Sequence, residues 1–327
     1  MAPRPRCGTG VVRVVVTGGA GFIGANLVRR LLDEGHEVVV VDDLSTGRLA
    51  NLDAVAGRIE RHEASVLDAP ALDAALAGAA AVVHLAARPS VPRSIDDPVA
   101  THRANVDGTL AVLEAARRAG PDAPHLVVAS SSSVYGANPA LPKHEDLVAR
   151  PLSPYAASKL AAEAYALAYA HSYALDVLVL RFFNVFGPLQ PADHAYAAVV
   201  PAFVDAALAG RPVTVHGDGT QTRDFTYVDT VTAVLADAVT RRVADPAPVN
   251  LAFGTRTDLL TVLERLEALL GHPIVREHTA PRAGDVPHSV ADASRLRALF
   301  PDVEPVDLEA GLAATVEWFR SGAAAPS

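Results

Sequence analysis

Short apolar runs alternate with longer amphipathic stretches over the first half of the chain. The valine-rich run Val11–Val16 is typical of a strand buried on both faces, and helical spacing follows over Phe22–Leu32. Further strands are expected at Val38–Val41, Ile59–His62, Val82–His84, Leu126–Ala129 and Val177–Leu180, with helices at 70–77, 98–119 and 155–172. Strands and helices that alternate in this way predict parallel βαβ units in a doubly wound α/β fold.

Beyond about residue 184 the pattern breaks into pieces separated by proline and glycine. Short strands are expected near Val213–His216 and Val249–Leu251, and helices at 258–270 and 307–320. The pattern predicts a first domain over residues 1–183, mainly a parallel sheet with its helices, and a smaller α/β domain over residues 184–321. The segments of the two are expected to interleave. Residues 322–327 form an Ala/Pro/Ser tail that we expect to fray.

Composition excludes several classes of protein. Half of the 327 residues are hydrophobic and 20% are charged, which is typical of a folded globular protein. The 28 basic and 37 acidic residues give a net charge of −9, and the basic ones are scattered, so neither a nucleic-acid nor a membrane partner is expected. Apolar runs are far shorter than the roughly 20 residues that cross a bilayer. The single cysteine, Cys7, excludes an internal disulfide and a cysteine-based zinc site; no metal is expected, and a reducing cytoplasm fits.

A glycine-rich turn lies between the first expected strand and helix. Gly18, Gly21 and Gly24 fall within the segment Thr17–Gly24. This spacing lets the backbone approach a pyrophosphate and lets the helix pack closely on the strand. The helix N-terminus would offer free N–H groups and the positive end of its dipole to phosphate. Three glycines alone would also form an ordinary tight turn, but their place between strand and helix favours a dinucleotide site.

An acidic residue ends the second expected strand. Asp42 lies 18 residues beyond Gly24, where a carboxylate can accept hydrogen bonds from the hydroxyls of an adenosine ribose. Asp43 follows it and Arg48 is the nearest cation, so a 2′-phosphate would meet repulsion without compensation. The pattern favours NAD over NADP. A solvated loop aspartate is the alternative for either residue.

A tyrosine and a lysine stand four residues apart at the start of the helix expected after Ser153-Pro154. Tyr155 and Lys159 would share one helix face. A phenol with a pKa of about 10 is a poor base at neutral pH, but a neighbouring ammonium and a positively charged nicotinamide would favour the phenolate. The chain has two lysines against twenty-six arginines, so a lysine here is notable. A surface pair is the alternative interpretation.

Four serines, Ser130–Ser133, follow the strand expected at Leu126–Ala129. Parallel sheets place ligand-binding groups at the carboxyl ends of their strands, so these hydroxyls are candidates for a site. Serines in such a run also commonly cap a turn. Their occurrence together with the glycine turn and the Tyr–Lys pair favours the functional interpretation.

Together these motifs resemble the extended short-chain dehydrogenase/reductase family. His84–Ala87, Asn105, Arg181–Pro188 and Arg223–Phe225 strengthen the resemblance, which spans about residues 11–320. Within the family the chain is most similar to UDP-glucose/UDP-N-acetylglucosamine 4-epimerases. The resemblance implies a Rossmann-type sheet, NAD as cofactor, a UDP-sugar as substrate, and a homodimer formed through the helices at 98–119 and 155–172.

The resemblance also implies roles for single residues. Tyr155 would take the proton of the sugar 4-hydroxyl, Lys159 would hold the nicotinamide ribose and lower the pKa of the tyrosine, and Ser131 would hydrogen-bond O4. The other cofactor residues would be Gly18, Gly21, Phe22, Ile23, Asp42, Asp43, Ser45, Thr46, Gly47, Ser65, Val66, Leu85, Ala86, Ala87, Asn105, Ser130 and Phe182. The substrate site would add Asn184, Val199, Thr214, His216, Arg223, Arg282, Asp285 and Ser289.

Within that set, Asn184, Arg223 and Arg282 would hold the diphosphate and Asp285 the uridine ribose, with surface ion pairing as the alternative.

Two positions bear on the choice of reaction. Relatives that eliminate water carry an Asp-Glu pair where this chain has Ser132-Ser133, so a dehydration would lack its acid and base. Ser289 stands where some epimerases have a tyrosine, which leaves room for an N-acetyl group. The resemblance therefore implies an NAD-dependent 4-epimerase of UDP-hexoses: hydride passes from C4 to NAD+, the 4-keto sugar turns, and hydride returns to its other face.

Three alternatives stay open. A UDP-glucuronate 4-epimerase would want an extra cation or hydroxyls near C6, which the sequence does not place. A dehydratase is weaker for lack of the Asp-Glu pair. A non-catalytic NAD-binding regulator is the alternative of another class, although such a protein has no need of the Ser–Tyr–Lys set.

Overall fold

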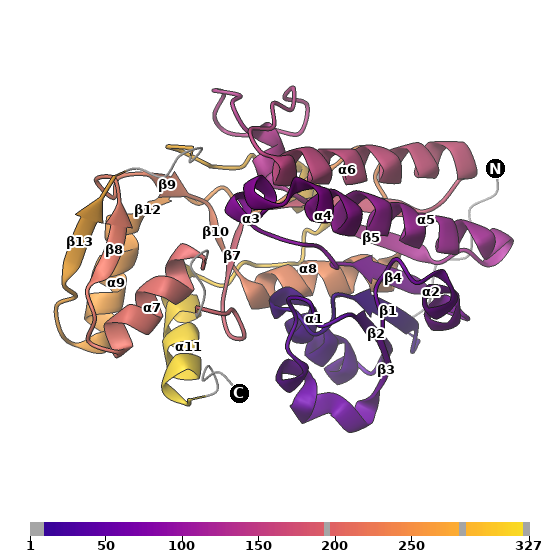
Figure 1. Cartoon of the computed structure of the whole chain (residues 1–327), viewed down its shortest axis with the longest axis horizontal. Helices are drawn as coiled ribbons and strands as arrows, with labels where there is room; N and C mark the ends of the chain where they lie inside the picture. Colours follow the sequence, from indigo (N-terminus) through magenta and orange to yellow (C-terminus); the bar gives the residue numbers. More distant parts are fainter. Residues whose placement is uncertain (1–9, 193–196, 281–285, 323–327) are drawn as a thin grey trace.

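A seven-stranded sheet forms the central layer of the protein (Figure 1). The computed structural model describes residues 10–192, 197–280 and 286–322. The strands follow the order β11-β6-β5-β4-β1-β2-β3, and every neighbouring pair is parallel. Their bounds are β1 (Arg13–Thr17), β2 (Glu37–Asp42), β3 (Ile59–Glu63), β4 (Ala81–His84), β5 (His125–Ser131), β6 (Val177–Phe182) and β11 (Val249–Leu251). The predicted doubly wound α/β fold is confirmed.

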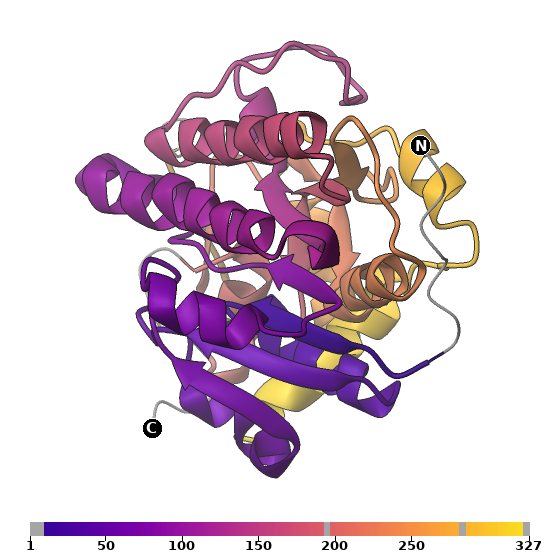
Figure 2. The ribbon, with the colours of Figure 1, turned by 90° about the vertical axis from the view of Figure 1, so that its right-hand side faces the viewer.

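Helices cover both faces of this sheet, as the valine-rich strands require. Alternate residues of β1 enter different cores: Val14 and Val16 pack in one apolar cluster, and Val15 in the other. The first cluster contains side chains of α1 (Phe22–Asp33) and α8 (Val228–Arg241). The second contains side chains of α2 (Ala69–Leu76), α5 (Gly108–Arg118) and α6 (Pro154–Tyr173), and Figures 1 and 2 show α5 and α6 side by side.

A smaller group of elements lies beside the carboxyl edge of the sheet, at the left of Figure 1. Three two-stranded sheets pair β7 (Asn184–Phe186) with β10 (Phe225–Tyr227), β8 (Val213–His216) with β13 (Arg276–Thr279), and β9 (Thr222–Arg223) with β12 (Thr257–Asp258). The strands β7, β8 and β10 share an apolar core with α7 (Val199–Leu208), α9 (Leu259–Leu270) and α11 (Leu308–Arg320). The chain returns from this group to the large sheet through α8 and β11.

Most expected elements agree with the structure to within three residues, and the differences have identifiable causes. The helices α7 and α8 were not expected, because segments rich in valine, and in α8 also in threonine, favour strands when judged alone. The helix expected at 98–119 is divided: α4 (Pro98–His102) and α5 flank a π-helical turn at Arg103–Asp107. The remaining short elements are α3 (Val91–Asp96), α10 (Ser294–Leu299) and turns of 3-10 helix at Leu49–Arg58, Gly120–Asp122 and Ser132–Tyr135.

The glycine turn between β1 and α1 is packed too closely for larger residues. A Cβ on Gly24 would lie 2.1 Å from the carbonyl oxygen of Gly18. Gly18 itself has a φ of +71°, and a Cβ there would lie 2.7 Å from the backbone nitrogen of Ala86. The turn therefore brings the first helix against the ends of β1 and β4 at a distance that only glycine permits.

Replacing Gly24 by alanine should destabilise the protein, because the added methyl group meets backbone atoms that cannot move alone. We expect a loss of about 1–3 kcal/mol in the free energy of unfolding, measured by urea denaturation. Gly57→Ala is the matched control, since a Cβ on Gly57 meets no atom within 4 Å. Equal unfolding midpoints for the two variants would contradict the close packing described here.

Candidate active site

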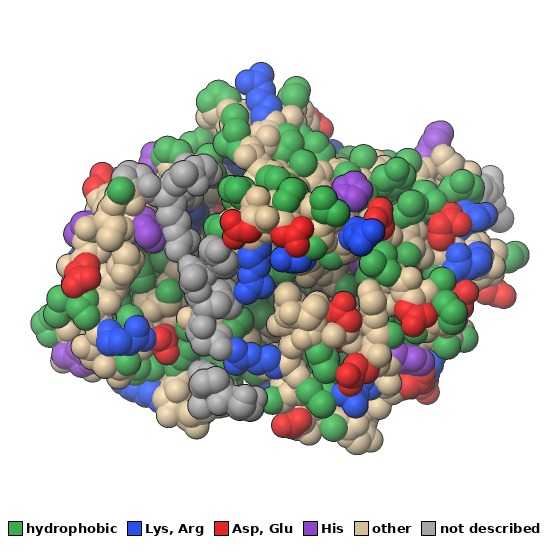
Figure 3. Space-filling view, in the orientation of Figure 1, with side chains coloured by type: hydrophobic (Ala, Val, Ile, Leu, Met, Phe, Trp, Pro, Cys, Tyr) green, Lys and Arg blue, Asp and Glu red, His purple; other side chains and the backbone are tan. Residues whose placement is uncertain are grey.

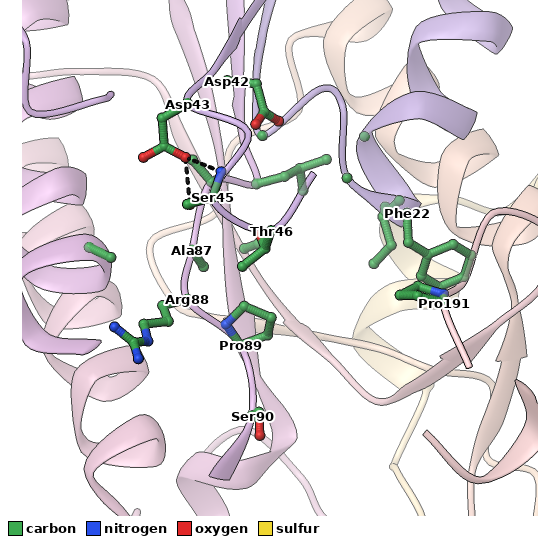
Figure 4. A pocket seen from close by; sticks show the side chains of 18 of the residues that line it. Phe22, Asp42, Asp43, Ser45, Thr46, Ala87, Arg88, Pro89, Ser90 and Pro191 are labelled. Carbon is green, nitrogen blue, oxygen red and sulfur yellow. Dashed lines mark hydrogen bonds between the residues drawn. The ribbon is translucent and has the colours of Figure 1, made fainter. Parts of the chain in front are cut away.

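A cavity of about 1200 Å³ runs along the carboxyl edge of the large sheet (Figure 4). Because all seven strands are parallel, the segments that follow them converge on this edge. The glycine turn after β1, the end of β2 and the segments after β3, β4 and β5 all contribute to its lining. The start of α6, the segment after β6 and Trp318 of α11 complete it. The cavity therefore collects residues from both groups of elements.

The glycine turn offers donors to a phosphate group. Gly18, Gly21, Phe22 and Ile23 line the cavity where α1 begins. The N-cap residue Gly21 places no side chain on the free N–H groups of the first helical turn. An uncapped helix start beside a cavity is a ready site for a pyrophosphate. The backbone here fits a dinucleotide cofactor.

Asp42 ends β2 as expected and also shapes the turn beside it. Its carboxylate accepts hydrogen bonds from the backbone nitrogens of Ala20 at 2.9 Å and Leu44 at 2.8 Å. Burial raises the pKa of Asp42, although these two hydrogen bonds oppose the rise. The neighbouring Asp43 accepts from the backbone nitrogen of Ser45 at 3.0 Å, as Figure 4 shows. Each Asp42 oxygen keeps a lone pair for a ribose hydroxyl.

The predicted Ser–Tyr–Lys set meets at the cavity. Ser153 caps α6 by accepting a hydrogen bond from the backbone nitrogen of Ala156 at 3.1 Å, so Tyr155 falls in the first turn. Its phenol lies near enough to the hydroxyl of Ser131, at the end of β5, for that hydroxyl to lower the pKa of the phenol. Ser133 donates in turn to Ser131, with 2.9 Å between the two hydroxyl oxygens. A line of two serine hydroxyl groups therefore leads to the phenol.

Burial shifts the pKa values of both Tyr155 and Lys159. Burial raises the pKa of Tyr155, and the hydrogen bond from Ser131 lowers it only in part. Burial also lowers the pKa of Lys159 to about 8, and its ammonium donates to the carbonyl oxygen of Ala129 at 2.9 Å. Lys159 is not among the groups that shift the pKa of the phenol. Because the ammonium is directed at the backbone of β5, the expectation that this lysine lowers the pKa of Tyr155 stays a prediction for the NAD-bound protein.

A buried ion pair that the sequence did not reveal lies behind the site. The guanidinium of Arg181 binds both carboxylate oxygens of Glu163, at 2.6 and 3.0 Å, and both side chains are 5% exposed. Ser130 donates to the same carboxylate at 2.9 Å. Glu163 is one helical turn beyond Lys159 and therefore lies on the same face of α6. This spacing was the signal in the sequence that could have indicated that Glu163 is buried near the site. The pair joins α6, β5 and β6 directly beneath the serines.

A second buried network holds the wall formed by the segment after β4. His84 bonds to Thr17 at 2.8 Å and to Thr109 at 3.0 Å. Burial, with a smaller effect of the Lys159 ammonium, lowers the pKa of His84 to about 3, so the ring is neutral. Asn105, in the π-helical turn, accepts from the backbone nitrogen of Arg88 at 2.7 Å. These contacts fix the segment that begins at His84 and lines the cavity.

Most of the predicted cofactor residues are brought together. The cavity is lined by Gly18, Gly21, Phe22, Ile23, Asp42, Asp43, Ser45, Thr46, Ser65, Val66, Leu85, Ala86, Ala87, Ser130, Ser131, Tyr155, Lys159 and Phe182. Two do not line it. Asn105 uses its amide to hold Arg88 and Ser158, and Gly47 lies against Asp42 and Ala20. Both support residues of the wall.

The predicted substrate residues lie beyond this lining. Asn184, Val199, Thr214, His216, Arg223 and Ser289 are outside it, and Arg282 and Asp285 lie outside the described residues. Asn184 stands between Phe183 and Val185, which both line the cavity, and Val199 follows the lining residue Ala198. Thr214 and His216 are on β8, where His216 bonds to Thr279 at 2.9 Å.

Several lining residues had not been expected. These are chiefly Arg88, Pro89, Ser90, Arg93, Arg103, Leu189, Gln190, Pro191 and Trp318. The first four continue directly from the His84–Ala87 run, and Leu189 to Pro191 continue from Arg181–Pro188, so nearness to those motifs was the available signal. Figure 4 shows Arg88, Pro89 and Ser90 along one wall and Phe22 beside Pro191 on another.

The cavity is more basic than the chain as a whole. Arg48, Arg88, Arg93, Arg103 and Lys159 line it, whereas Asp42 and Asp43 are the acidic residues of the described lining. The chain carries a net charge of −9, so this local excess of cations is specific to the cavity. In the space-filling view, basic side chains gather beside the hollow at the centre of this face (Figure 3). Such a lining suits anionic ligands such as nucleotide diphosphates.

The described residues contain no group of acidic, histidine or cysteine side chains that could hold a metal ion. Nor does any helix of the described segments have the length and apolar character to span a membrane. The cavity brings together an uncapped glycine turn, the carboxylate of Asp42 and a phenol beside a serine hydroxyl. These features suit a dinucleotide-dependent α/β enzyme.

Comparison with known proteins identifies the family. Residues 14–252 match the NAD dependent epimerase/dehydratase family. The chain is 42% identical to a UDP-glucose 4-epimerase of Mycolicibacterium smegmatis over 322 residues, 95% of this chain and 99% of that protein. It is 36% identical to a probable UDP-glucuronate 4-epimerase of Rhizobium meliloti, covering 94% and 97% of the two. The chain belongs to this family, and its cofactor is NAD.

A solved structure agrees with this assignment. The UDP-N-acetylglucosamine 4-epimerase from Methanobrevibacter ruminantium, in complex with UDP-N-acetylmuramic acid, superposes with a TM-score of 0.89 at 35% identity. The superposition covers 95% of this chain and 99% of that one. The resemblance noted from the motifs is thereby confirmed at the level of the family.

Glu163→Gln should destabilise the protein strongly, because it leaves the buried guanidinium of Arg181 without its counter-charge. We expect a loss of about 3–5 kcal/mol in the free energy of unfolding. The matched control is Glu34→Gln, which removes the partly exposed pair of Glu34 with Arg30 and should cost about 0–1 kcal/mol. Chemical denaturation of both variants makes the comparison, and a loss for Glu163→Gln no larger than the control's would refute the role of the pair.

Proposed function

We propose that this protein is an NAD-dependent 4-epimerase of UDP-hexoses, acting on UDP-glucose and UDP-galactose and accommodating their N-acetylated forms. The observation that carries the proposal is that the hydroxyl of Ser131 and the phenol of Tyr155 lie together in the cavity that also contains the glycine turn. Bound NAD supplies an acceptor for the hydride of C4 and returns it to the opposite face of the sugar.

The protein's own groups manage the proton. Tyr155 takes the proton of the sugar 4-hydroxyl as C4 is oxidised, and gives it back when C4 is reduced. Ser131 donates to the phenolic oxygen and so favours the ionised form that burial alone opposes. Lys159, held by the carbonyl oxygen of Ala129, places a positive charge in the cavity lining beside the same helix turn. Because both groups of elements line the cavity, the 4-keto sugar, still attached to UDP, would be held between them from one step to the next.

The charged residues of the lining favour epimerisation over dehydration. Elimination of water from the sugar would need a further acid and base near C5 and C6. The acidic residues of the described lining are Asp42 and Asp43, at the end of β2. In the sheet, β1 and β4 separate β2 from β5, which carries Ser131. The segment beside Tyr155 instead supplies the hydroxyls of Ser131 and Ser133.

A second candidate substrate is UDP-glucuronate. Arg88 and Arg93 line the cavity after β4, and Arg88 pairs with Asp97 at a long 3.4 Å. A guanidinium in the wall could receive the carboxylate that distinguishes glucuronate from glucose. The relative from Rhizobium meliloti is described as acting on this sugar. The two candidates share one site and one reaction.

Substrate choice is tested by incubating the NAD-loaded protein separately with UDP-glucose, UDP-N-acetylglucosamine and UDP-glucuronate. We expect product NMR to show the C4 epimer of UDP-glucose. Conversion of UDP-glucuronate alone would replace the first candidate by the second. Formation of a 4-keto-6-deoxy sugar, or the absence of any product, would contradict the proposed reaction.

Tyr155→Phe should lower kcat by about 10²–10⁴-fold, because it removes the group that carries the proton. Tyr165→Phe is the matched control: Tyr165 lies on the same helix but is 43% exposed and outside the cavity lining. Coupled-assay rates of both variants, at equal NAD content, make the comparison. A Tyr155→Phe protein that turns over at the wild-type rate would exclude the phenol as the acid–base group.

A further inference from the structure

Asp224 is a fully buried carboxylate outside the cavity lining. It is 0% exposed, and it lies between Arg223 of β9 and Phe225 of β10. No ion pair within the described segments involves it. A carboxylate buried without a cation needs several hydrogen-bond donors to remain charged. The surrounding chain supplies them.

The donors come from two separate segments. One oxygen of Asp224 accepts from the backbone nitrogens of Gly254 and Ala291, both at 3.0 Å. The other accepts from the hydroxyl of Thr255 at 2.9 Å. Asn184 reaches the same residue from a third segment, since its backbone nitrogen donates to the carbonyl oxygen of Asp224 at 3.2 Å. Asp224 is therefore the point at which three segments distant in sequence meet.

The segment around Ala291 is held along its length. Thr222 exchanges backbone hydrogen bonds with it, accepting from Ser289 at 3.0 Å and donating to Pro287 at 3.0 Å. On the other side, Lys143 donates from its backbone nitrogen to Val290 at 2.7 Å. The carboxylate of Asp224 adds a third contact, because it accepts a hydrogen bond from the backbone nitrogen of Ala291. This bond holds the segment against β9 and β10.

We infer that Asp224 is a positioning residue for the nucleotide end of the substrate. This inference rests on the proposed function and on the roles that the family resemblance implies, in which Asn184 and Arg223 hold the diphosphate and Ser289 belongs to the substrate site. Asp224 adjoins Arg223 in the chain, binds Asn184 through its carbonyl, and through Ala291 fixes the segment that carries Ser289. Asp224 thereby links three residues that would contact the ligand: its carboxylate holds the segment of Ser289, its carbonyl oxygen binds Asn184, and Arg223 precedes it in the chain.

An amide cannot replace this carboxylate. Ionised aspartate offers acceptors on both oxygens, whereas asparagine must turn an NH₂ group toward either Thr255 or the N–H groups of Gly254 and Ala291. The asparagine NH₂ group and the donor that it faces would then both lack an acceptor, and their repulsion would push apart the segments that Asp224 joins. Asp224→Asn keeps the size of the side chain, so it tests the hydrogen-bonding pattern and not the packing.

The experiment measures UDP and UDP-glucose affinity by calorimetry, and kcat and KM, for wild type, Asp224→Asn and Thr255→Val. Thr255→Val removes one donor and leaves the carboxylate in place. We expect Asp224→Asn to weaken UDP binding by about tenfold or more and to raise KM by a similar factor, with Thr255→Val giving a smaller loss. NAD affinity and kcat should change by less than about threefold, because the cavity residues around Tyr155 are not held by Asp224.

Asp307→Asn is the control for the same chemical change elsewhere. Asp307 caps α11 by accepting from the backbone nitrogen of Ala310 at 2.7 Å, on the surface. It should leave UDP affinity at the wild-type value. If folded Asp224→Asn binds UDP as tightly as wild type, the inference is wrong, even where its unfolding temperature falls. If it does not fold, unchanged UDP affinity in Thr255→Val refutes the inference equally.

The wild-type arm separates the two levels of the proposal. If wild type binds neither UDP nor UDP-glucose and converts no UDP-sugar, the proposed function fails, and the inference fails with it. If wild type binds UDP and converts the UDP-sugar, and the Asp224→Asn and Thr255→Val variants bind UDP as tightly as wild type, the proposed function stands and the role of Asp224 is refuted.

Discussion

The proposed catalytic arrangement depends on one buried hydrogen bond, from the ammonium of Lys159 to the carbonyl oxygen of Ala129 at 2.9 Å. It joins α6 to the end of β5 at a fixed register. Tyr155 lies one helical turn before the lysine, and Ser131 lies two residues beyond the alanine, so the bond brings phenol and hydroxyl within contact. The buried pair of Glu163 and Arg181 secures the same junction one turn further along the helix. Burial at this junction also raises the pKa of the Tyr155 phenol. The same packing that holds the phenol in place therefore makes its proton harder to remove.

The fold of the first half of the chain could be predicted because its strands are buried on both faces. Runs such as Val38–Val41 carry a signal that needs no tertiary context. The second half was harder, because its elements depend on partners distant in sequence. The helix α8 is rich in valine and threonine and becomes helical where it packs against α1 and the sheet. The strand β11 could be located, but only its pairing with β6 makes it part of the large sheet.

The residues expected to bind the cofactor could be predicted to meet, because they belong to short motifs at strand ends, which parallel topology brings together. The lining arginines Arg88 and Arg93 could not be assigned, since which face of a loop points inward is decided by contacts such as that of Asn105 with Arg88. The sequence placed Asp42 correctly but not its bonds to Ala20 and Leu44, which also shape the turn. A motif identifies which residue stands at a strand end. Whether the side chain of that residue bonds to a ligand or to the backbone depends on the tertiary structure.

The central claim is that hydrogen leaves C4 of the sugar and returns to C4 within one enclosed cavity, with Tyr155 handling only the hydroxyl proton. UDP-glucose labelled with deuterium at C4 tests this directly. In ordinary water, the UDP-galactose formed should retain essentially all of the deuterium at C4, and NMR of the product measures it. Loss of the label to solvent, or its appearance at C5, would show that a proton is abstracted from carbon and would contradict the mechanism.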